Sequence, residues 1–321
     1  MNEFNLCITL DTDADPVDKN HKNSITFENL DYNLSEIFRN INLIKSKINL
    51  EIPISWFVRI DNQIKEIFGE YDWILNNYSK FWDQQILEKN EIHWHAHIYQ
   101  KIENQWFFPK NDEVFINKIK DVHDYLKKNN LNFNCVRLGE AYMTNNIMNF
   151  LRNTGLKADS SCIPGRKRDD NEKSFDWTNS PNHPYFPAEQ NYQLENINNK
   201  KFIEIPMNTI QTKCSYDKSY FLRYANLAFR NEVMLKGLRN HIQHNDLLVT
   251  ISHPYEFSNN YYKNSKLFYG DISILENNLI CIMNICKEFN KKLKLITIND
   301  VIKKFGELII IKFYRKKLKK S

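Results

Sequence analysis

Three histidines within five residues are the most chemically informative feature of this chain. The segment 91–97 reads Glu-Ile-His-Trp-His-Ala-His, so His93, His95 and His97 are each separated by one residue. In an extended strand, side chains two positions apart point to the same face. Imidazole is the commonest protein ligand for borderline divalent metals such as Zn²⁺. The spacing therefore predicts a metal site, for which a carboxylate must come from elsewhere in the chain.

Two aspartates are candidates for that carboxylate. Asp11 and Asp13 follow the apolar run 4–10, and they point the same way if the strand continues through them. Two carboxylates this close repel each other unless a cation or a proton lies between them. One could bind a metal while the other acts on water. A surface turn or a helix cap is the structural alternative for the pair.

Two further polar residues end predicted strands. Arg137 ends the run 133–137, where an arginine could hold a carboxylate by bidentate pairing. An exposed salt bridge is the alternative for Arg137. His253 ends the β-branched run 247–252 and is a candidate general acid, with a packed core histidine as the alternative.

Predicted strands and helices alternate along the chain and would position these residues. Short apolar runs predict strands, and apolar residues spaced three to four positions apart predict helices. The strands are 4–10, 52–60, 91–97, 133–137, 202–205, 247–252 and 293–298; the helices are 30–48, 71–87, 114–128, 145–154 and 273–290. This alternation predicts a parallel sheet or a (β/α) barrel, in which functional residues lie at the carboxyl ends of strands. The polar segment 162–200 is expected to cross that active face.

Composition limits the remaining possibilities. The 321 residues, 42% hydrophobic and 26% charged, suit one large α/β domain or two small ones. We expect a catalytic domain over 1–305 and a basic tail over 306–321. The tail carries six positive charges, one more than the net charge of +5 of the whole chain, so the rest of the chain is close to neutral. The sequence shows no basic stripe of the kind that indicates a nucleic-acid partner. The six cysteines form no metal-binding spacing and suit reduced thiols.

The ends of the chain bear on its location. The N-terminus carries no secretory pattern and no stretch is long enough to span a membrane, which favours the cytoplasm. The apolar run 308–311 followed by basic residues could lie on the inner face of an anionic membrane. A solvated charged end is the alternative for this tail.

Taken in order, these segments resemble the polysaccharide deacetylase family, also called the NodB-homology or carbohydrate esterase 4 group. The similarity covers most of residues 4–300. The matching segments, from the first motif to the fifth, are 9–13, 91–97, 137–139 with 159–161, 176–177 with 184–185, and 251–253. Segments 56–61 and 204–206 are similar to a branch associated with surface-polysaccharide gene clusters.

The resemblance implies an irregular (β/α) barrel of the NodB type and a role for each motif residue. Asp11 would be the catalytic base, oriented by Arg137, and His253 the general acid. Asp13 and His95 would bind the metal. The usual second metal histidine lies at a position that is Tyr99 here, so His97 would replace it, with the pair His93 and His97 as the alternative. The chain also departs from the family at 138–140, where Leu-Gly-Glu follows the arginine instead of Pro-Tyr.

The resemblance also implies a reaction. It is the metal-dependent removal of an N-acyl group, N-acetyl in the first place, from a sugar. The implied setting is the biosynthesis of surface polysaccharides, namely O-antigen (lipopolysaccharide) or capsule. Zn²⁺ is the expected metal, with Co²⁺, Ni²⁺ or Fe²⁺ as alternatives, and the sugar is expected to be nucleotide- or lipid-linked. The expected substrate contacts are Arg59, Asp176, Trp177 and Tyr185. The alternative functions are deformylation, O-deacetylation or cleavage of a non-sugar amide at the same site, and sugar binding by an impaired site.

Overall fold

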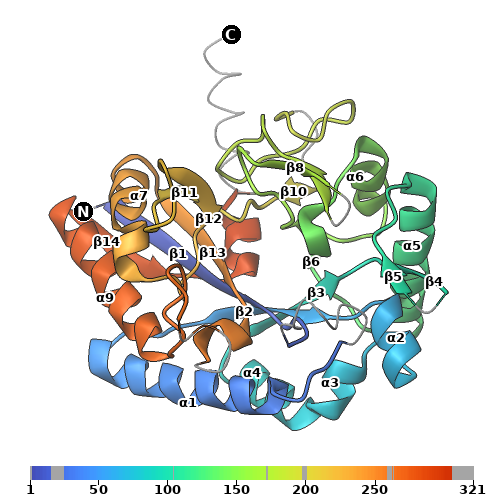
Figure 1. Cartoon of the computed structure of the whole chain (residues 1–321), viewed down its shortest axis with the longest axis horizontal. Coiled ribbons are helices and arrows are strands. Elements are labelled where there is room, and N and C mark those ends of the chain that lie inside the picture. Colours follow the sequence, from blue (N-terminus) through green and yellow to red (C-terminus); the bar gives the residue numbers. More distant parts are fainter. Residues whose placement is uncertain are drawn as a thin grey trace.

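A parallel sheet of eight strands forms the centre of the protein (Figure 1). The computed structural model describes residues 2–15, 25–103, 105–170, 173–196, 201–258, 262 and 264–305. The strand order is β10-β7-β6-β3-β2-β1-β13, and β14 pairs with the first half of β1. These strands are β1 (Asn2–Asp11), β2 (Ile54–Arg59), β3 (Glu91–Ala96), β6 (Cys135–Leu138), β7 (Ala158–Asp159), β10 (Ile203–Glu204), β13 (Leu247–Ser252) and β14 (Lys291–Leu295). The predicted α/β class with a parallel sheet is confirmed.

The sheet curls, and Asn208, which follows β10 at one end of the sheet, bonds to β13 at the other end. Strands β10 and β13 stand at opposite ends of the strand order, and no strand pairing joins them in the described part of the chain. Instead, the Asn208 N–H donates to the Val249 carbonyl of β13 at 3.1 Å, and the Asn208 Oδ1 accepts the Val249 N–H at 2.6 Å. The sheet is therefore an irregular barrel.

Helices cover the outer face of the curled sheet (Figure 1). They are α1 (Leu30–Ile48), α2 (Asn62–Phe68), α3 (Trp73–Asn77), α4 (Ser79–Leu87), α5 (Asp112–Lys128), α6 (Asn145–Arg152), α7 (Asn231–His244) and α9 (Ser273–Glu288). The predicted helix 71–87 is two helices that meet at Tyr78. Helix α7 was not predicted, although its apolar residues have helical spacing.

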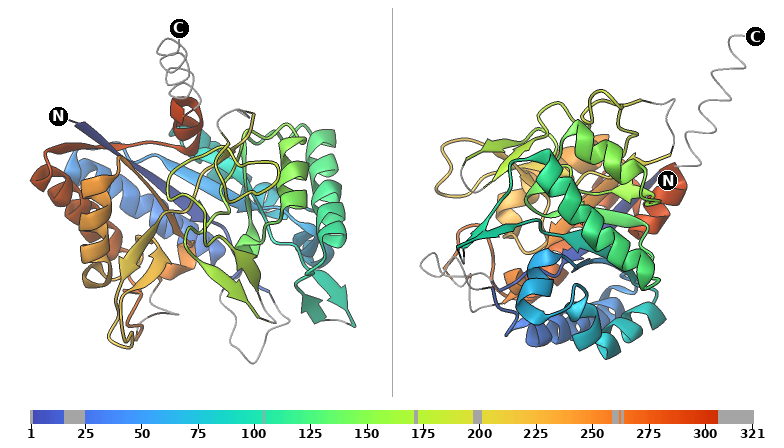
Figure 2. Two further views of the ribbon diagram at one scale, coloured as in Figure 1. Left: turned by 90° about the horizontal axis from the view of Figure 1, so that it is seen from above. Right: turned by 90° about the vertical axis from the view of Figure 1, so that its right-hand side faces the viewer.

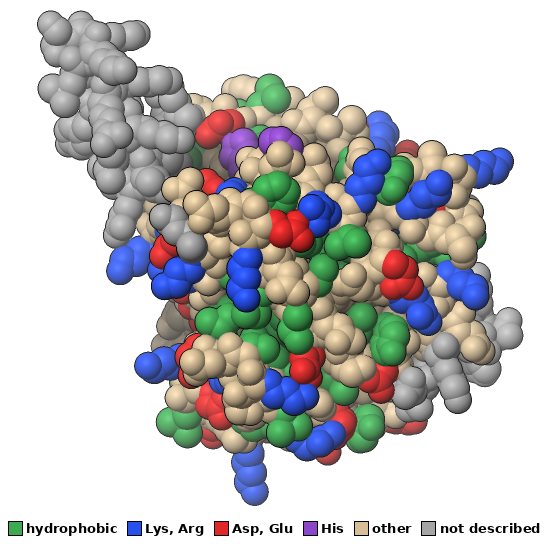
Figure 3. Space-filling view, turned by 90° about the vertical axis from the view of Figure 1, so that its left-hand side faces the viewer, with side chains coloured by type: hydrophobic (Ala, Val, Ile, Leu, Met, Phe, Trp, Pro, Cys, Tyr) green, Lys and Arg blue, Asp and Glu red, His purple; other side chains and the backbone are tan. Residues whose placement is uncertain are grey.

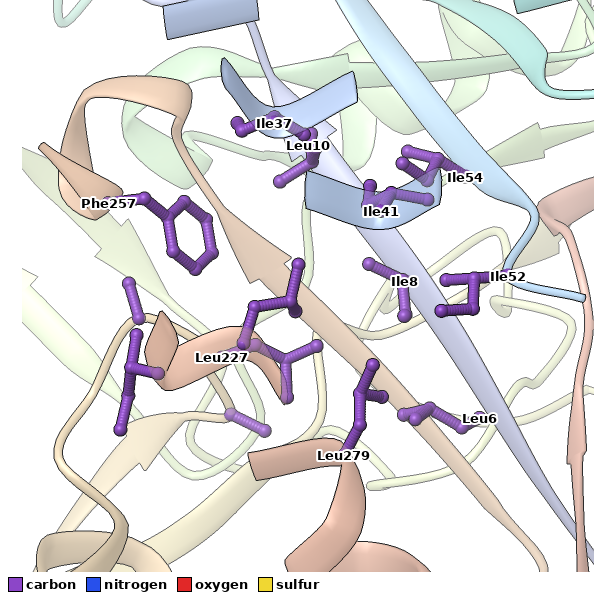
Figure 4. Close-up of a cluster of buried hydrophobic side chains, with 14 of the residues drawn as sticks. Leu6, Ile8, Leu10, Ile37, Ile41, Ile52, Ile54, Leu227, Phe257 and Leu279 are labelled. Carbon is purple, nitrogen blue, oxygen red and sulfur yellow. The ribbon is translucent and has the colours of Figure 1, made fainter. Parts of the chain in front are cut away.

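Strand β1 shows why the interior of the barrel carries the polar side chains. Because successive side chains of a strand alternate, Leu6, Ile8 and Leu10 point outward and pack against α1 and its neighbours (Figure 4). Each such buried leucine or isoleucine contributes roughly 1.5–3 kcal/mol to stability. The alternate positions point into the barrel and end with Asp11, which is buried. The other strands follow the same alternation, so inward residues at their carboxyl ends meet.

Three antiparallel hairpins project from the same side of the molecule (Figure 2). They are β4 (Gln100–Ile102) with β5 (Gln105–Phe107), β8 (Lys167–Asp169) with β9 (Ser174–Asp176), and β11 (Thr209–Thr212) with β12 (Phe221–Tyr224). The β8–β9 hairpin lies within the segment 162–200 that was expected to cross the active face. The hairpins extend the barrel beyond the ends of its strands.

The surface and the end of the chain bear on the predicted partners. Basic and acidic side chains are interspersed over the face shown in Figure 3. Among the described residues, no helix is long and apolar enough to cross a membrane. The predicted basic tail 306–321, with its expected membrane contact, lies outside the described residues.

Candidate active site

Four strands bring polar residues to one end of the barrel. Asp11 ends β1, His95 and Arg137 lie near the ends of β3 and β6, and His253 directly follows β13. The carboxyl ends of parallel strands meet at one edge of a sheet, which is where α/β folds place their sites. All four residues line the same cavity.

Asp13, His95 and His97 form a group that could hold a metal ion. The His97 Nε2 atom lies 2.9 Å from Asp13 Oδ1 and 3.0 Å from His95 Nε2, and His95 Nε2 lies 3.1 Å from the same Asp13 oxygen. The three ligand atoms therefore form a triangle with nearly equal sides. In a tetrahedral zinc site with bonds of about 2.1 Å, ligand atoms are about 3.4 Å apart. A small outward shift of these groups fits an ion of that size.

The charges of the group also suit a cation. Burial alone would raise the pKa of Asp13, but His97, His95 and a hydrogen bond from His253 hold that pKa well below its usual range. Burial opposes the charged form of His95, yet Asp11 and Asp13 raise its pKa. Without a metal, a proton on His95 is thus favoured by the neighbouring carboxylates. A bound divalent ion would displace that proton.

Neighbouring groups fix the two imidazoles. The His95 Nδ1 atom bonds to the Arg137 carbonyl at 2.8 Å, which leaves His95 Nε2 free to act as a ligand. The backbone N–H of His97 donates to Asp61 Oδ2 at 3.1 Å, and Arg59 pairs with the same carboxylate at 2.7 Å. The Tyr99 ring stacks on the His97 ring, with centroids 5.9 Å apart. Tyr99 therefore supports His97, although it occupies the position where the resemblance implied a ligand.

Gly139 provides the space that the His97 ring occupies. A Cβ at this position would lie 2.5–2.6 Å from three atoms of the ring, so glycine alone fits. The backbone then takes the left-handed conformation at Glu140 (φ 60°) and Ala141 (φ 54°), which is sparsely populated for residues with a Cβ. The departure from the family pattern at 138–140 is thus where the chain makes room for His97.

His93 lies outside the metal group. It shares the inward face of β3 but is two residues earlier, where its Nε2 lies 3.1 Å from Glu91 Oε2 and its ring packs 5.2 Å from the Phe57 ring. Burial lowers the pKa of His93. The structure therefore brings His95 and His97 to Asp13, and the alternative pair of His93 with His97 is not formed.

Arg137 is buried and holds Asp11. Its Nη1 donates to Asp11 Oδ1 and, at 2.9 Å, to Thr9 Oγ1, while its Nε and Nη2 donate to the carbonyl and hydroxyl of Ser160. Its guanidinium carbon also lies 3.8 Å from the centroid of the Phe57 ring. The second oxygen of Asp11 is 3.9 Å from His95 Nε2. Asp11 is thus fixed by one oxygen and presents the other beside the metal group.

His253 lies between two carboxylates. Its Nε2 is 3.3 Å from Asp13 Oδ2, and its Nδ1 is 3.1 Å from Glu256 Oε1. Glu256 also accepts the His253 backbone N–H at 2.8 Å and the Asn226 side chain at 2.7 Å, which fixes its position. Burial opposes protonation, but Glu256 and Asp13 raise the pKa of His253 well above its usual range. The imidazole therefore holds a proton at neutral pH.

These residues form the floor of a cavity of about 400 Å³, and its walls carry groups that sequence reasoning missed. One wall is aromatic and contains Tyr224, Tyr255, Tyr262 and Phe268. The other is charged and contains Glu140, Arg166, Arg168 and Lys173. Glu140 accepts the Tyr99 hydroxyl at 2.6 Å and pairs with Lys173. Only Glu256 had a sequence signal, because an acidic residue three positions after a helix N-cap, here His253, often closes a capping box.

The four expected substrate contacts do not line this cavity. Trp177 and Tyr185 are fully buried, with the indole N–H on the Ala141 carbonyl and the phenol hydroxyl on the Tyr192 carbonyl. Asp176 pairs with Lys167 at 2.8 Å, and Arg59 is buried against Asp61. Both aromatic rings are fully buried, so they have no face to offer to a sugar.

Comparison with known proteins gives distant structural matches. No family model matches the chain, and no curated protein sequence matches it. The chain is similar to 4-α-glucanotransferase from Thermococcus litoralis, at 10% identity and a TM-score of 0.45, over 95% of this chain and 41% of that one. It therefore spans about two fifths of that protein's length. It is also similar to a mutant of a CE4 family pseudoenzyme with restored enzymatic activity, at 9% identity and a TM-score of 0.40, over 94% of this chain and 68% of that one. A GH57-type branching enzyme from the hyperthermophilic archaeon Pyrococcus horikoshii matches at 10% identity and a TM-score of 0.45, over 94% of this chain and 70% of that one.

Proposed function

We propose that the protein is a metal-dependent hydrolase that removes an N-acyl group, N-acetyl in the first place, from a sugar. The observation that carries the proposal is the arrangement of the cavity floor. A group suited to a metal, formed by Asp13, His95 and His97, is flanked by Asp11 and by His253. The order of the motifs along the sequence, which resembles the polysaccharide deacetylases, supports the same reaction.

Asp13, His95 and His97 would hold the metal. One carboxylate with two imidazoles suits Zn²⁺ and leaves a coordination position open, and Co²⁺, Ni²⁺ or Fe²⁺ accept the same ligands. When bound, such an ion supplies Lewis acidity, which activates water and polarises an amide carbonyl. The protein's part is to hold these three ligand atoms within about 3 Å of one another.

Asp11 would act as the general base. Arg137 fixes one of its oxygens, and the other lies beside His95 at 3.9 Å, where it can accept a proton from the attacking water. Three other acceptors, the Thr9 hydroxyl and the carbonyl and hydroxyl of Ser160, in turn fix the Arg137 guanidinium. The base is therefore oriented before substrate arrives, which lowers the cost of reaching the reactive geometry.

His253 would act as the general acid. An amine leaves a tetrahedral centre poorly unless it is protonated, and a protonated imidazole on the cavity floor can supply that proton. Glu256 and Asp13 favour the protonated form of His253, and the Glu256 carboxylate lies 3.1 Å from its Nδ1. Asp11 takes a proton and His253 gives one, so the two residues together return the site to its starting charge.

The proposed substrate is a nucleotide- or lipid-linked N-acetyl sugar of surface-polysaccharide biosynthesis. A cavity of about 400 Å³ is in the range of small-molecule sites, roughly 300–1,000 Å³. Its aromatic wall offers rings with exposed edges or faces, which can pack against the apolar face of a sugar. Stacking on this wall replaces the role expected of Trp177 and Tyr185.

The metal is tested first. Purified protein should bind about one Zn²⁺, Co²⁺, Ni²⁺ or Fe²⁺ per chain, and His95→Ala should lose it. His241→Ala is the matched control, because His241 is also buried but bonds to the Leu247 carbonyl away from the cavity. A folded wild-type protein that stays empty when offered these metals would contradict the proposal.

The reaction is tested by acetate release from nucleotide-linked N-acetyl sugars. Asp11→Asn keeps the shape of the side chain and removes the base, so the rate should fall by about 10²–10⁴. Asp72→Asn is the control, since Asp72 is a buried aspartate that accepts the Tyr125 hydroxyl outside the cavity. Undiminished acetate release by Asp11→Asn would refute the assignment of the base. No acetate from the N-acetyl sugars, together with formate from the matching N-formyl sugars, would identify a deformylase.

A further inference from the structure

The charged wall of the cavity contains two arginines that the proposed chemistry does not use. Arg166 immediately precedes β8 and Arg168 lies within it, and both side chains line the cavity together with the metal group and His253. Both side chains are partly exposed. They come from a hairpin that projects beyond the strand ends, so they face the part of a substrate that extends away from the reacting acyl group.

The contacts of Arg166 are unusual for a partly buried guanidinium. Its Nη1 donates to the Leu222 carbonyl at 2.7 Å, and its guanidinium carbon lies 4.5 Å from the centroid of the Phe221 ring. Among the residues that the structure describes, no carboxylate forms an ion pair with Arg166, whereas Arg168 pairs with Asp170 and Arg223 with Asp217. The aromatic contact and the carbonyl orient the guanidinium without neutralising it.

The surroundings of Arg166 are electrostatically unfavourable in the absence of an anion. Burial and the nearby charges of Arg223 and Arg168 lower the pKa of Arg166, while Tyr224 opposes the shift. Like charges this close, with one of them unpaired, are repulsive. An anion that binds beside Arg166 and Arg168 would relieve this repulsion and accept hydrogen bonds from the remaining N–H groups of Arg166.

We propose that Arg166, assisted by Arg168, binds a phosphate group attached to the sugar substrate. A guanidinium presents a planar fork that matches the oxygens of phosphate or carboxylate. Two neighbouring guanidiniums suit a phosphate or diphosphate better than the single charge of a carboxylate. The inference rests on the proposed function only for the position of the sugar, because the arginine contacts stand without it.

Lys173 is not part of this phosphate site. It lines the same wall, but Glu140 neutralises it, and Glu140 also accepts the Tyr99 hydroxyl. Burial opposes the charged form of Glu140, yet Lys173 and His97 lower its pKa, so the pair stays ionic. The unbalanced positive charge of the wall therefore lies at Arg166.

The test is a set of binding measurements by calorimetry, with N-acetylglucosamine 1-phosphate, UDP-N-acetylglucosamine, a short polyprenyl diphosphate sugar, the neutral methyl glycoside and an N-acetylated uronic acid. The Asp11→Asn protein is used as the background so that the ligands survive. Phosphorylated ligands should bind more tightly than the neutral glycoside, with an affinity that falls as salt is added. Arg166→Gln should weaken their binding about 10- to 100-fold and leave the neutral glycoside unchanged.

Controls separate the possible failures. Arg39→Gln removes a surface arginine that pairs with Glu36 and should change nothing. Arg166→Lys keeps the charge but lacks the planar fork of the guanidinium, so its affinity for phosphorylated ligands should lie between those of the wild type and Arg166→Gln. This variant replaces Arg166→Gln in the test if the glutamine variant misfolds. Equal affinity for the neutral and phosphorylated ligands, or a uronic acid bound as tightly as the phosphate, would overturn the inference. Arg166-dependent binding without acetate release by the wild type would instead refute the proposed function alone.

Discussion

Replacing Gly139 with alanine should weaken metal binding although it changes no ligand. The new Cβ would lie 2.5 Å from His97 Cγ and 2.6 Å from its Cδ2 and Nδ1. Carbon atoms pack comfortably from about 3.5 Å, so the ring and the backbone must separate by about 1 Å. The ring has little freedom to retreat, because Tyr99 stacks on it and Asp61 holds the His97 N–H.

The size of the effect follows from this displacement. A shift of about 1 Å moves His97 Nε2 by about as much, and changes to groups that position metal ligands typically weaken metal binding about 10- to 100-fold. A misplacement of this size can lower the rate by about 100-fold. Crowding should also cost about 1–3 kcal/mol of unfolding free energy. The variant should therefore fold, bind metal weakly and turn over slowly.

The assay is Zn²⁺ affinity by competition with a chromophoric chelator, accompanied by urea unfolding. Gly155→Ala is the matched control, because a Cβ there has no atom within 4 Å but its φ of +96° strains any other residue. That control should lose about 1–2 kcal/mol of stability and keep its metal affinity. If Gly139→Ala binds Zn²⁺ as tightly as the wild type, the space beside His97 is not what positions this ligand.

Two further outcomes are expected. His253→Gln should keep its metal, because His253 is not in the ligand group, but should lose about 10²–10⁴ in acetate release; loss of metal content in this variant would contradict the separation of roles. Burial and Asp159 raise the pKa of Glu204, so its proton stabilises the fold below the usual carboxyl pKa, and this stability is lost as pH rises toward the raised value. Glutamine has no such proton to lose. The free energy of unfolding of Glu204→Gln should therefore equal that of the wild type near pH 4 and exceed it by about 1.4 kcal/mol for each pH unit above pH 4, until the raised pKa is reached. Denaturant unfolding from pH 4 to 8 tests this, and parallel pH profiles for the two proteins would disprove it.

The positions of the site residues along the strands were predictable because they depend on the alternation of side chains within short stretches of sequence. A period of two places Asp11, His95 and Arg137 on the inward face of their strands, and the parallel sheet brings the strand ends together. Helix α1 begins and ends as predicted because its apolar stripe is regular and Asn49 leaves it at φ 53°. These features depend on short stretches of chain.

The features that could not be predicted depend on tertiary contacts. The sequence places three histidines on one face, but β3 ends at Ala96, and the pairing of His97 with Asp13 depends on Asp61 and Gly139, which lie far away in the chain. Trp177 and Tyr185 were expected to face a sugar because their segment was expected to cross the active face. Both are fully buried, and Trp177 packs in the same hydrophobic cluster as Trp94 of β3 and Phe115 of α5.

Under the proposed function, two of the three hairpins, β8–β9 and β11–β12, would separate the selection of a substrate from the chemistry performed on it. The reactive groups stand on strand ends within the barrel, while Arg166, Arg168 and Tyr224 belong to hairpins outside it. The hairpins form sheets of their own, separate from the pairings of β1, β3, β6 and β13. If the proposed function holds, changes in these hairpins would alter the sugar preference while the same aspartates and histidines carried the reaction.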